Sequence, residues 1–438
     1  MQISLENTGT FERRLTVTLP AERLDDAVRS RLQRLSREVR LKGFRPGKVP
    51  MSVVEKRFGA QVREEAYGEL VRDSFGEALR QENLRPAMAP RITPVAQPER
   101  GEVAYTAEFE VMPELDKVDV SGLSIERVEA SVSEVDIDEM IQTLRLQRRT
   151  WNRVERAAVA GDMVLFEHVA EHDGQRWPAQ GVDRAGTILG SGAMLEDLEA
   201  ELVGLSPDQE KSFDLAFPAD WRDANLAGKT AKVSVKVSHV QESQLPAVDE
   251  AFIGSFGIAG GDMAKFRADV RANLERELAN ALMARLKNAV IGQLLDAHKD
   301  LAVPQGMVDA EAQAMQRDAE RQRQQAREQG RDLPPVPPAE AFAEQAARRV
   351  RAAVLIGAIA QQNGIRLDGQ RVREALAQIA ATYEEPDQVV QLYYSNEQLM
   401  AGLQQRVLED QVTEWVATQA KVDTRRLGFA EVMKPQQG

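Results

Sequence analysis

The side chains that most often perform covalent chemistry are scarce in this sequence. The chain contains no cysteine, four histidines and no Gly-x-Ser-x-Gly nucleophile elbow, so neither a thiolate nucleophile nor a histidine-based triad is indicated. His168 and His172 are four residues apart, but they fall in a segment with the character of a strand. Four strand residues span roughly 13 Å, which is too far for one metal ion. We therefore predict that the protein holds no metal and no cofactor.

A carboxylate cluster and a glycine pair lack the remaining parts of a binding site. Residues 196–201 contain four carboxylates, which we interpret as a solvated surface turn, because a divalent cation would need oxygen ligands converging from elsewhere. The Gly-Ser-Gly of residues 190–192 lacks the third glycine of a nucleotide-binding loop, since Leu195 occupies its place. The sequence therefore predicts no ATP site, and any partner must bind and leave spontaneously.

The sharpest chemical signal is the segment 43–50, which reads Gly-Phe-Arg-Pro-Gly-Lys-Val-Pro. Two glycines and two prolines cannot continue a helix, so we predict an exposed loop. Phe44 lies beside Arg45 and Lys48. An exposed aromatic ring next to cations can dock a protein or a structured RNA, because the charges meet carboxylates or phosphates while the ring fills a pocket. The alternative is a helix-to-helix turn with Phe44 folded inward, and the residues alone leave both open.

The elements around this loop form a small α+β domain. Residues 11–19 alternate between polar and apolar side chains, which predicts a half-buried strand. Residues 21–41 and 51–82 have helical spacing on either side of the loop. Residues 103–111 repeat with a period of two, as in a strand with one face in water. The order of strand, helices and strand predicts an α+β domain over residues 1–112.

The rest of the chain divides into three further parts. Residues 113–149 are acidic and contain one amphipathic helix. Short strands alternate with glycine-containing turns from 150 to 246, which predicts an antiparallel β domain. Residues 247–438 are nearly all helical, with apolar side chains recurring every four residues between 262 and 300. The predicted fold class is therefore a multidomain α+β chain that ends in an all-α domain.

Charge is spread unevenly along the sequence. The formal net charge is -13, yet residues 1–98 hold 18 Lys and Arg against 13 Asp and Glu. An acidic chain with one basic end favours an anionic partner at that end, although a solvated helix face is the alternative. The longest apolar run, residues 352–360, is far shorter than the roughly 20 residues of a bilayer span. With no signal-peptide pattern at the start, we expect a cytoplasmic protein without a membrane partner.

The segment 43–50 resembles the ribosome-docking signature of the trigger factor family, Gly-Phe-Arg-x-Gly-Lys-x-Pro, and it follows a basic helix as that signature does. The similarity extends through most of the chain, including the opening Met-Gln-Ile-Ser and residues 224–229. It implies a ribosome-binding domain, a linker that packs on the C-terminal domain, an FKBP-type peptidyl-prolyl isomerase domain and a helical chaperone domain. The implied function is an ATP-independent chaperone for nascent and unfolded polypeptides at the ribosomal exit tunnel.

The resemblance also implies which residues dock on the ribosome. The expected partners are a ribosomal protein at the tunnel exit and nearby ribosomal RNA, and a homodimer of the free protein is left open. The variable position of the signature is often lysine in relatives and is Pro46 here, so one cation is lost and docking is expected to be weaker or more sensitive to salt. The matching positions are Gly43, Phe44, Arg45, Gly47, Lys48 and Pro50.

The pocket residues of the family's isomerase domain are poorly matched in this sequence. Rotation about a peptide bond crosses a barrier of about 20 kcal/mol, and FKBP-type sites lower it by holding the twisted amide in an apolar, aromatic-lined pocket. His168 stands where an aromatic ring is usual, and Trp221 replaces a tyrosine, which removes a hydroxyl donor. We therefore predict a preserved fold, retained affinity for apolar peptide, and weak or absent turnover. The pocket positions implied by the resemblance are His168, Trp177, Leu195, Leu198, Trp221 and Val233.

Two rival functions use the same residues. In the first, prolyl isomerisation is the main activity and the helical domain only recruits substrate; the altered pocket argues against it. In the second, the basic helix belongs to a nucleic-acid-binding module, which predicts affinity for bare RNA rather than for intact ribosomes. The acidic character of the remaining parts of the chain argues against this second function.

Overall fold

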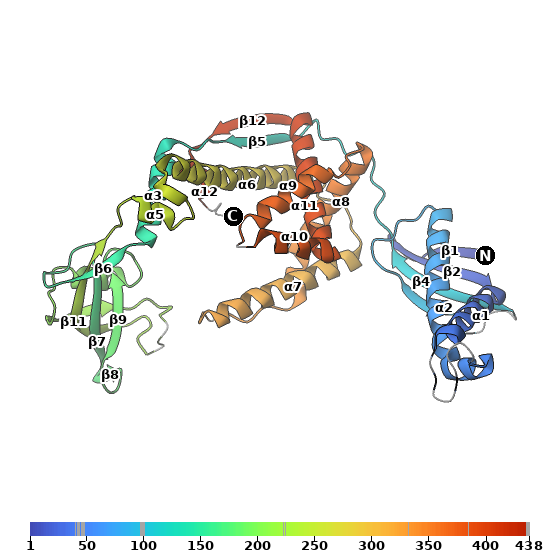
Figure 1. Cartoon of the computed structure of the whole chain (residues 1–438), viewed down its shortest axis with the longest axis horizontal. Coiled ribbons are helices and arrows are strands. Elements are labelled where there is room, and N and C mark those ends of the chain that lie inside the picture. The colour runs from blue at the N-terminus through green and yellow to red at the C-terminus, as the bar shows by residue number, and fades with distance from the viewer. Residues whose placement is uncertain are drawn as a thin grey trace. The chain divides into compact units, whose positions relative to one another are not determined.

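The structure of the chain is a computed structural model (Figure 1). It describes residues 1–434 except 40, 42, 43, 45–48, 97–100, 222, 224, 332 and 384. The chain divides into two compact units, which are Met1–Val128 with Met283–Arg425, and Glu129–Leu282 with Arg426–Gly438. Helices and antiparallel sheets follow one another along the chain. The predicted multidomain α+β class is therefore confirmed.

The N-terminal part of the first unit is built on a four-stranded antiparallel sheet of order β1-β2-β4-β3. Alternate residues of β2, namely Leu15, Val17 and Leu19, are buried, as the period of two predicts. Tyr105 of β4 is also buried, and its hydroxyl oxygen lies 2.9 Å from the Ser74 hydroxyl, so both buried polar groups are paired. The strands are β1 (Gln2–Asn7), β2 (Glu12–Pro20), β3 (Arg91–Pro94) and β4 (Glu102–Glu110).

Two long helices follow β2 and flank the predicted docking loop. Each helix begins directly after a proline, Pro20 or Pro50, whose φ is -59° in both cases. Proline suits the start of a helix because its missing N–H would have no partner there. The helices pack through an apolar cluster centred on Leu32, Val54 and Val62. They are α1 (Ala21–Glu38) and α2 (Met51–Gln81).

The remainder of the first unit is a helical body. Its largest apolar cluster joins Leu355, Ile359 and Val412 of the helices to Val118 and Ile125 of the segment after the N-terminal sheet. The elements are α6 (Met263–Ala297), of which residues 283–297 belong to this unit, α7 (Gln305–Glu328), η2 (Ala339–Phe342), α8 (Ala343–Gln362), α9 (Gly369–Ala380), α10 (Pro386–Ser395) and α11 (Glu397–Gln419).

A carboxylate joins the N-terminal sheet to the helical body. Glu110 is the last residue of β4 and accepts hydrogen bonds from the backbone N–H groups of Gln305 (3.1 Å) and Gly306 (2.8 Å). These are the first two residues of α7, where backbone donors lack helical partners and the helix dipole favours negative charge. A Cβ atom on Gly306 would lie 2.7 Å from a carboxylate oxygen of Glu110. Glycine at this position therefore permits the close approach.

The second unit contains a six-stranded antiparallel sheet with the path β10-β11-β7-β8, in which β6 also pairs with β11 and β9 with β7. One face of the sheet carries an apolar core that includes Phe166, Leu202 and Val237. The predicted antiparallel β character of this stretch is confirmed. The elements are β6 (Thr150–Val154), β7 (Met163–His172), β8 (Gln175–Trp177), β9 (Asp183–Ile188), α4 (Glu196–Leu202), β10 (Glu210–Ala216) and β11 (Thr230–Gln244).

Short helices complete the second unit around three phenylalanine rings. Phe252 and Phe266 meet edge to face with centroids 5.9 Å apart, and Phe256 lies beside both. The helices are α3 (Glu134–Gln147), α5 (Glu250–Gly254), η1 (Ala259–Gly261) and α12 (Phe429–Met433). A two-stranded sheet, which belongs to the first unit except for the last residue of each strand, pairs β5 (Ser124–Glu129) with β12 (Lys421–Arg426). Within the described residues, every helix is too short or too polar to cross a bilayer.

Candidate functional site

The loop between α1 and α2 is held at both ends and carries Phe44 outward. Leu41 and Val49 pack into the apolar cluster that joins the two helices. Phe44 lies between these two anchors with 40% of its surface exposed, and its backbone N–H donates to the Leu41 carbonyl at 3.1 Å. The alternative in which Phe44 folds inward is therefore not the arrangement seen. Pro50 closes the loop, since its carbonyl accepts hydrogen bonds from residues 53 and 54 of α2.

The other predicted docking positions, Gly43, Arg45, Gly47 and Lys48, lie outside the described residues. Their role in docking stays a prediction, as do those of Phe44 and Pro50.

Cations on the helices next to the loop divide into paired and unpaired groups. Arg63 forms an ion pair with Asp25 at 3.1 Å, which ties α2 to α1. Arg34 and Arg37 at the end of α1 and Lys56 at the start of α2 are exposed. In the described part of the chain, none of these three has an ion pair or a side-chain hydrogen bond. They are therefore available to an anionic partner that approaches the loop.

The predicted isomerase positions can be placed on the sheet of the second unit by strand register. Residues directly opposite each other on neighbouring antiparallel strands lie on the same face. Ala170 is opposite Val233 on one side and Trp177 on the other, and Val233 is in turn opposite Phe213. A row of apolar side chains thus crosses four strands, from Phe213 through Val233 and Ala170 to Trp177. Val233 and Ala170 are buried in the core, and the two aromatic residues at the ends of the row are half-buried. We call this side of the sheet, with its rim, the apolar sheet face.

His168 lies on the same face, two residues before Ala170 on β7. Its ring centroid is 5.7 Å from that of Phe166, and its register partners are Val235 and Asp183. Nδ1 is buried and has no hydrogen-bond partner among the described residues. Burial lowers the pKa of the imidazole, although the Asp183 carboxylate acts in the opposite direction. The ring is therefore neutral at pH 7, so it adds little charge to the apolar sheet face.

The remaining predicted pocket positions lie at the rim of this face. Leu195 precedes α4 and Leu198 lies within it, and both pack against the apolar core that contains Val233. Trp221 is 36% exposed and meets Phe217 of that core, with ring centroids 5.2 Å apart. The structure therefore brings the predicted pocket side chains to one side of the sheet. Whether they act on proline peptides stays a prediction.

One functional candidate was missed because its environment was interpreted wrongly. Glu199 was predicted to belong to a solvated turn, but it lies in α4 and only 5% of its surface is exposed. Its carboxylate accepts hydrogen bonds from the Thr187 hydroxyl (2.8 Å) and from the backbone N–H of Gly190 (2.9 Å). The sequence did contain a signal for this environment, because two glycines lie shortly before Glu199. A glycine-rich turn can direct several backbone N–H groups at one carboxylate.

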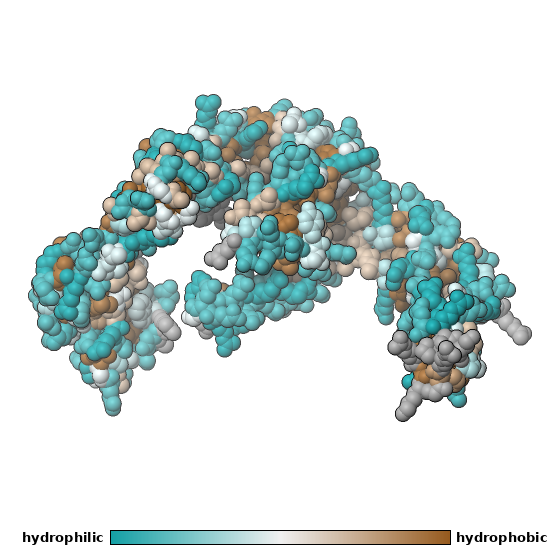
Figure 2. Space-filling model, in the orientation of Figure 1, coloured by the Kyte–Doolittle hydropathy of each residue, from teal (hydrophilic) through white to brown (hydrophobic). Residues whose placement is uncertain are grey.

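A groove of about 790 Å³ opens on the helical body of the first unit. We call it the helical groove. Figure 2 shows brown apolar patches within the teal surface over these helices. The groove has an apolar lining and a charged rim, where Arg349 pairs with Glu311 at 3.1 Å. Its apolar lining includes Met88, Ile291, Leu295, Met307, Ala310, Ala353 and Ile356, and its polar lining includes Asn288, Gln345, Arg348 and Gln405.

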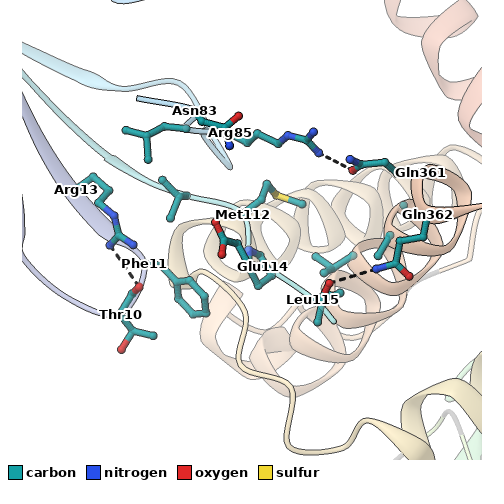
Figure 3. Close-up of a pocket in the computed structure, with 16 residues that line it drawn as sticks. Thr10, Phe11, Arg13, Asn83, Arg85, Met112, Glu114, Leu115, Gln361 and Gln362 are labelled. Carbon is teal, nitrogen blue, oxygen red and sulfur yellow. Dashed lines mark hydrogen bonds between the residues drawn. The ribbon is translucent and has the colours of Figure 1, made fainter. Parts of the chain in front are cut away.

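A second cavity, of about 670 Å³, lies where the N-terminal sheet meets α8. Figure 3 shows Arg85 reaching Gln361, with which it forms a hydrogen bond, and Gln362 donating to the Leu115 carbonyl at 3.2 Å. Phe11 and Met112 add apolar side chains to its wall. Its lining holds no cluster of titratable groups suited to catalysis. Across the described residues more widely, no three His, Cys, Asp or Glu side chains converge as metal ligands would.

Comparisons with known proteins point to one family. A family model described as "Bacterial trigger factor protein (TF)" matches residues 1–144, and a second, "Bacterial trigger factor protein (TF) C-terminus", matches residues 262–418. The chain is 47% identical to "Trigger factor" of Xanthomonas axonopodis pv. citri (strain 306) over 439 residues, which cover 99% of this chain and 100% of that protein. It is 46% identical to "Trigger factor" of Stenotrophomonas maltophilia (strain R551-3), with the same coverage.

A solved structure described as "Promiscuous Substrate Recognition in Folding and Assembly Activities of the Trigger Factor Chaperone" also aligns with the chain. The alignment covers 95% of this chain and 99% of that one, at 16% identity and a TM-score of 0.40.

Proposed function

Because the chain belongs to the bacterial trigger factor family, we propose that it is an ATP-independent, ribosome-associated chaperone that binds nascent polypeptides at the exit tunnel and assists their folding. The observation that carries the proposal is the exposed Phe44 at the tip of the α1–α2 hairpin, within a segment that matches the family's docking signature. An aromatic ring with 40% of its surface exposed beside cations supports a role in contacting an external partner.

We propose that the hairpin tip docks on a ribosomal protein beside ribosomal RNA. The Phe44 ring supplies apolar area for a pocket on the protein partner, as aromatic anchors do at interfaces. The unpaired Arg34, Arg37 and Lys56 supply charge for RNA phosphates, which contribute affinity without sequence specificity. Pro46 in place of the lysine common in relatives removes one such cation and makes the retained ones more important.

We propose that unfolded polypeptide binds in the helical groove. Methionine side chains such as Met88 and Met307 adapt to different partner shapes, because the thioether chain is unbranched and polarisable. The rim carries Arg348 next to the Arg349–Glu311 pair, so it offers polar contacts to segments of either charge. Apolar area with a polar rim suits weak binding of many sequences, which a chaperone for nascent chains requires.

An aggregation assay tests this function directly. A chemically denatured model protein is diluted into buffer without nucleotide, with or without an equimolar amount of the full chain, and light scattering is followed. The expected result is that the chain suppresses scattering and that added ATP changes nothing. Scattering that is unaffected by the chain, or suppressed only with ATP, would refute an energy-independent chaperone.

A second activity, prolyl isomerisation, is favoured by the apolar sheet face of the second unit. Trp177 and Trp221 give it aromatic character, but the half-buried imidazole of His168 replaces an aromatic ring and the tyrosine hydroxyl is missing. We predict that a protease-coupled proline-peptide assay finds weak or absent turnover. We also predict that Trp221→Ala leaves the folding yield of proline-free clients unchanged. Efficient turnover that Trp221→Ala abolishes would instead make isomerisation a principal activity.

We further propose the division of the chain into a ribosome-binding domain (1–112), a linker that packs on the C-terminal domain (113–149), an isomerase-like domain (150–246) and a helical chaperone domain (247–438). Support comes from the separate four-stranded and six-stranded sheets and from the packing of Val118 and Ile125 on the helical body. A homodimer of the free protein is part of the same proposal, since α10 exposes 65% of Tyr394 and 52% of Leu392. We also propose that the protein is located in the cytoplasm.

A further inference from the structure

Glu199 is a buried carboxylate without a cationic partner. Among the described residues, Asp162 is the other buried acid, and it is paired with Arg156 at 2.5 Å. Glu199 instead accepts hydrogen bonds from neutral donors only. These are the hydroxyls of Thr187 (2.8 Å) and Ser191 (3.5 Å) and the backbone N–H groups of Gly190 (2.9 Å), Met194 (3.1 Å) and Gly192 (3.2 Å). Burying a charge in this way is costly unless its hydrogen-bonding capacity is filled, as it is here.

The donors come almost entirely from one short loop, residues 190–194. Gly190 and Gly192 have φ values of +85° and +69°, a region in which glycine is favoured, and these turns aim their N–H groups at a single point. Such a concave set of amides normally attracts an anion. In this chain the anion is internal, because Glu199 lies one turn into the helix that follows the loop.

The loop leads directly into the rim of the apolar sheet face. Met194 is its last residue, and Met194, Leu195 and Leu198 pack against the same apolar core as Trp177. The backbone of residues 190–194 has little apolar contact of its own, since residues 190–193 are exposed. The hydrogen bonds to the carboxylate of Glu199 therefore tie this exposed loop, up to and including Met194, to α4.

We propose that Glu199 is a positioning residue for peptide binding: its carboxylate organises the loop 190–194 so that Met194 and Leu195 form one wall of the apolar sheet face. The inference rests on the proposed function of that face as a peptide-binding surface. It assigns Glu199 no contact with the peptide itself, because the side chain is covered by the loop that it holds.

The ionisation of Glu199 is consistent with this role. Burial raises the pKa of the carboxyl group, but hydrogen bonds from Thr187, Met194, Gly192 and Gly190 outweigh burial, and the pKa lies below its ordinary value. A folded-state pKa below that of the unfolded chain means that the carboxylate stabilises the fold above the unfolded pKa of about 4.3. This contribution is lost as the pH falls through the folded-state pKa.

Charged groups on the surrounding elements are engaged elsewhere. Arg184 of β9 pairs with Glu167 at 2.9 Å, and Lys211 of β10 pairs with Glu201 at 2.6 Å. Asp183 of β9 is opposite His168. On α4 itself, residues 196 and 197 are acidic and exposed to solvent. The pH dependence of the loop 190–194 is therefore expected to follow Glu199, while the apolar sheet face also carries the titratable His168.

The test is Glu199→Gln in the full chain, with Glu196→Gln as the matched control on the exposed side of the same helix. Glutamine keeps the shape but presents an NH₂ group to N–H donors, so at least one hydrogen bond is lost. Hydrogen exchange followed by mass spectrometry reports the loop locally. We expect exchange in residues 190–194 to accelerate roughly tenfold in Glu199→Gln and to stay unchanged in Glu196→Gln.

Peptide binding is measured in the same experiment with a synthetic peptide that contains leucine, proline and phenylalanine. Protection of residues 163–177 by the peptide should require roughly tenfold more peptide in Glu199→Gln than in wild type. Thr187→Val removes one hydrogen-bond donor and keeps the carboxylate, so the peptide concentration needed for protection should rise less than in Glu199→Gln. This variant replaces Glu199→Gln as the test if Glu199→Gln folds poorly. As the pH falls from 7, protonation of His168 should affect wild type and Glu199→Gln alike. The further weakening of protection that comes from Glu199 should appear in wild type only, and only below the ordinary pKa of about 4.3, because the folded-state pKa is lower still.

Each outcome is decisive. Unchanged exchange in residues 190–194 would overturn the role of Glu199 in organising the loop. Faster exchange with unchanged peptide protection would show that the loop is organised for stability alone and would overturn the positioning role. If the peptide protects nothing in wild type, the proposed peptide-binding function of the apolar sheet face fails, and the inference fails with it, while the exchange rates without peptide still report on the loop.

Discussion

Replacing Phe44 by alanine is expected to lower the affinity of the chain for intact ribosomes by roughly thirtyfold or more, because truncating a central aromatic anchor typically costs about 2 kcal/mol or more. The loss should come without a loss of stability, since 40% of the side chain is exposed and it lies outside the apolar cluster that joins α1 to α2. Adding Arg45→Ala should weaken binding further. Co-sedimentation with purified ribosomes over a range of protein concentrations measures the effect.

The control for this prediction is Tyr383→Ala, which truncates an aromatic side chain that is 58% exposed on the helical body. It should leave ribosome binding unchanged. A Phe44→Ala chain that sediments with ribosomes as well as wild type would remove the docking role of the loop. Binding to isolated ribosomal RNA as strong as binding to intact ribosomes would instead favour the nucleic-acid-binding module.

The second large effect is expected in the helical groove. Met88→Glu combined with Ala353→Glu places two carboxylates on the accessible lining of the groove. An apolar segment that binds there would remove water from each carboxylate and offer it no hydrogen-bond donor. An uncompensated polar group of this kind costs about 1–3 kcal/mol, so roughly tenfold more protein should be needed to suppress aggregation of the denatured client. Both side chains are exposed, so the fold should tolerate the change.

A matched control places the same two charges elsewhere. Val135→Glu with Val159→Glu modifies two valines in the second unit that are 64% and 49% exposed, and it should leave aggregation suppression and ribosome binding as they are in wild type. Equal suppression by the two double variants would place the client-binding surface outside the helical groove. Circular dichroism of both variants verifies that the helices are retained.

Much of the fold could be predicted from local pattern. The alternation of Leu15, Val17 and Leu19 predicts a strand with one buried face, and Pro20 indicates where the next helix begins. Periodicity succeeds in such segments because burial on one side alone decides which positions are apolar. By contrast, β12 is exposed along its whole length, so its sequence carries no such pattern, and its pairing with β5 is set by a segment roughly 300 residues away in the sequence.

The candidate sites could be predicted less completely. Residues 43–50 were found because their glycines, prolines, ring and cations lie together in the sequence, and the exposure of Phe44 then depends on how Leu41 and Val49 pack. Glu199 was missed because a carboxylate among other carboxylates is usually solvated, and only the folded loop shows that its donors converge. The docking and isomerase roles assigned to individual residues stay predictions for the variants described above.

The central claim is that one molecule docks on the ribosome through the hairpin tip and shields the emerging chain in the helical groove. The most direct measurement uses ribosomes stalled with an apolar nascent chain, and the full chain carrying a photo-reactive amino acid in place of Gln345, which lines the groove. We expect crosslinks from position 345 to the nascent chain without ATP, few crosslinks from position 135, and loss of both in Phe44→Ala. Crosslinking from position 345 that is absent, or that persists undiminished in Phe44→Ala, would contradict the account.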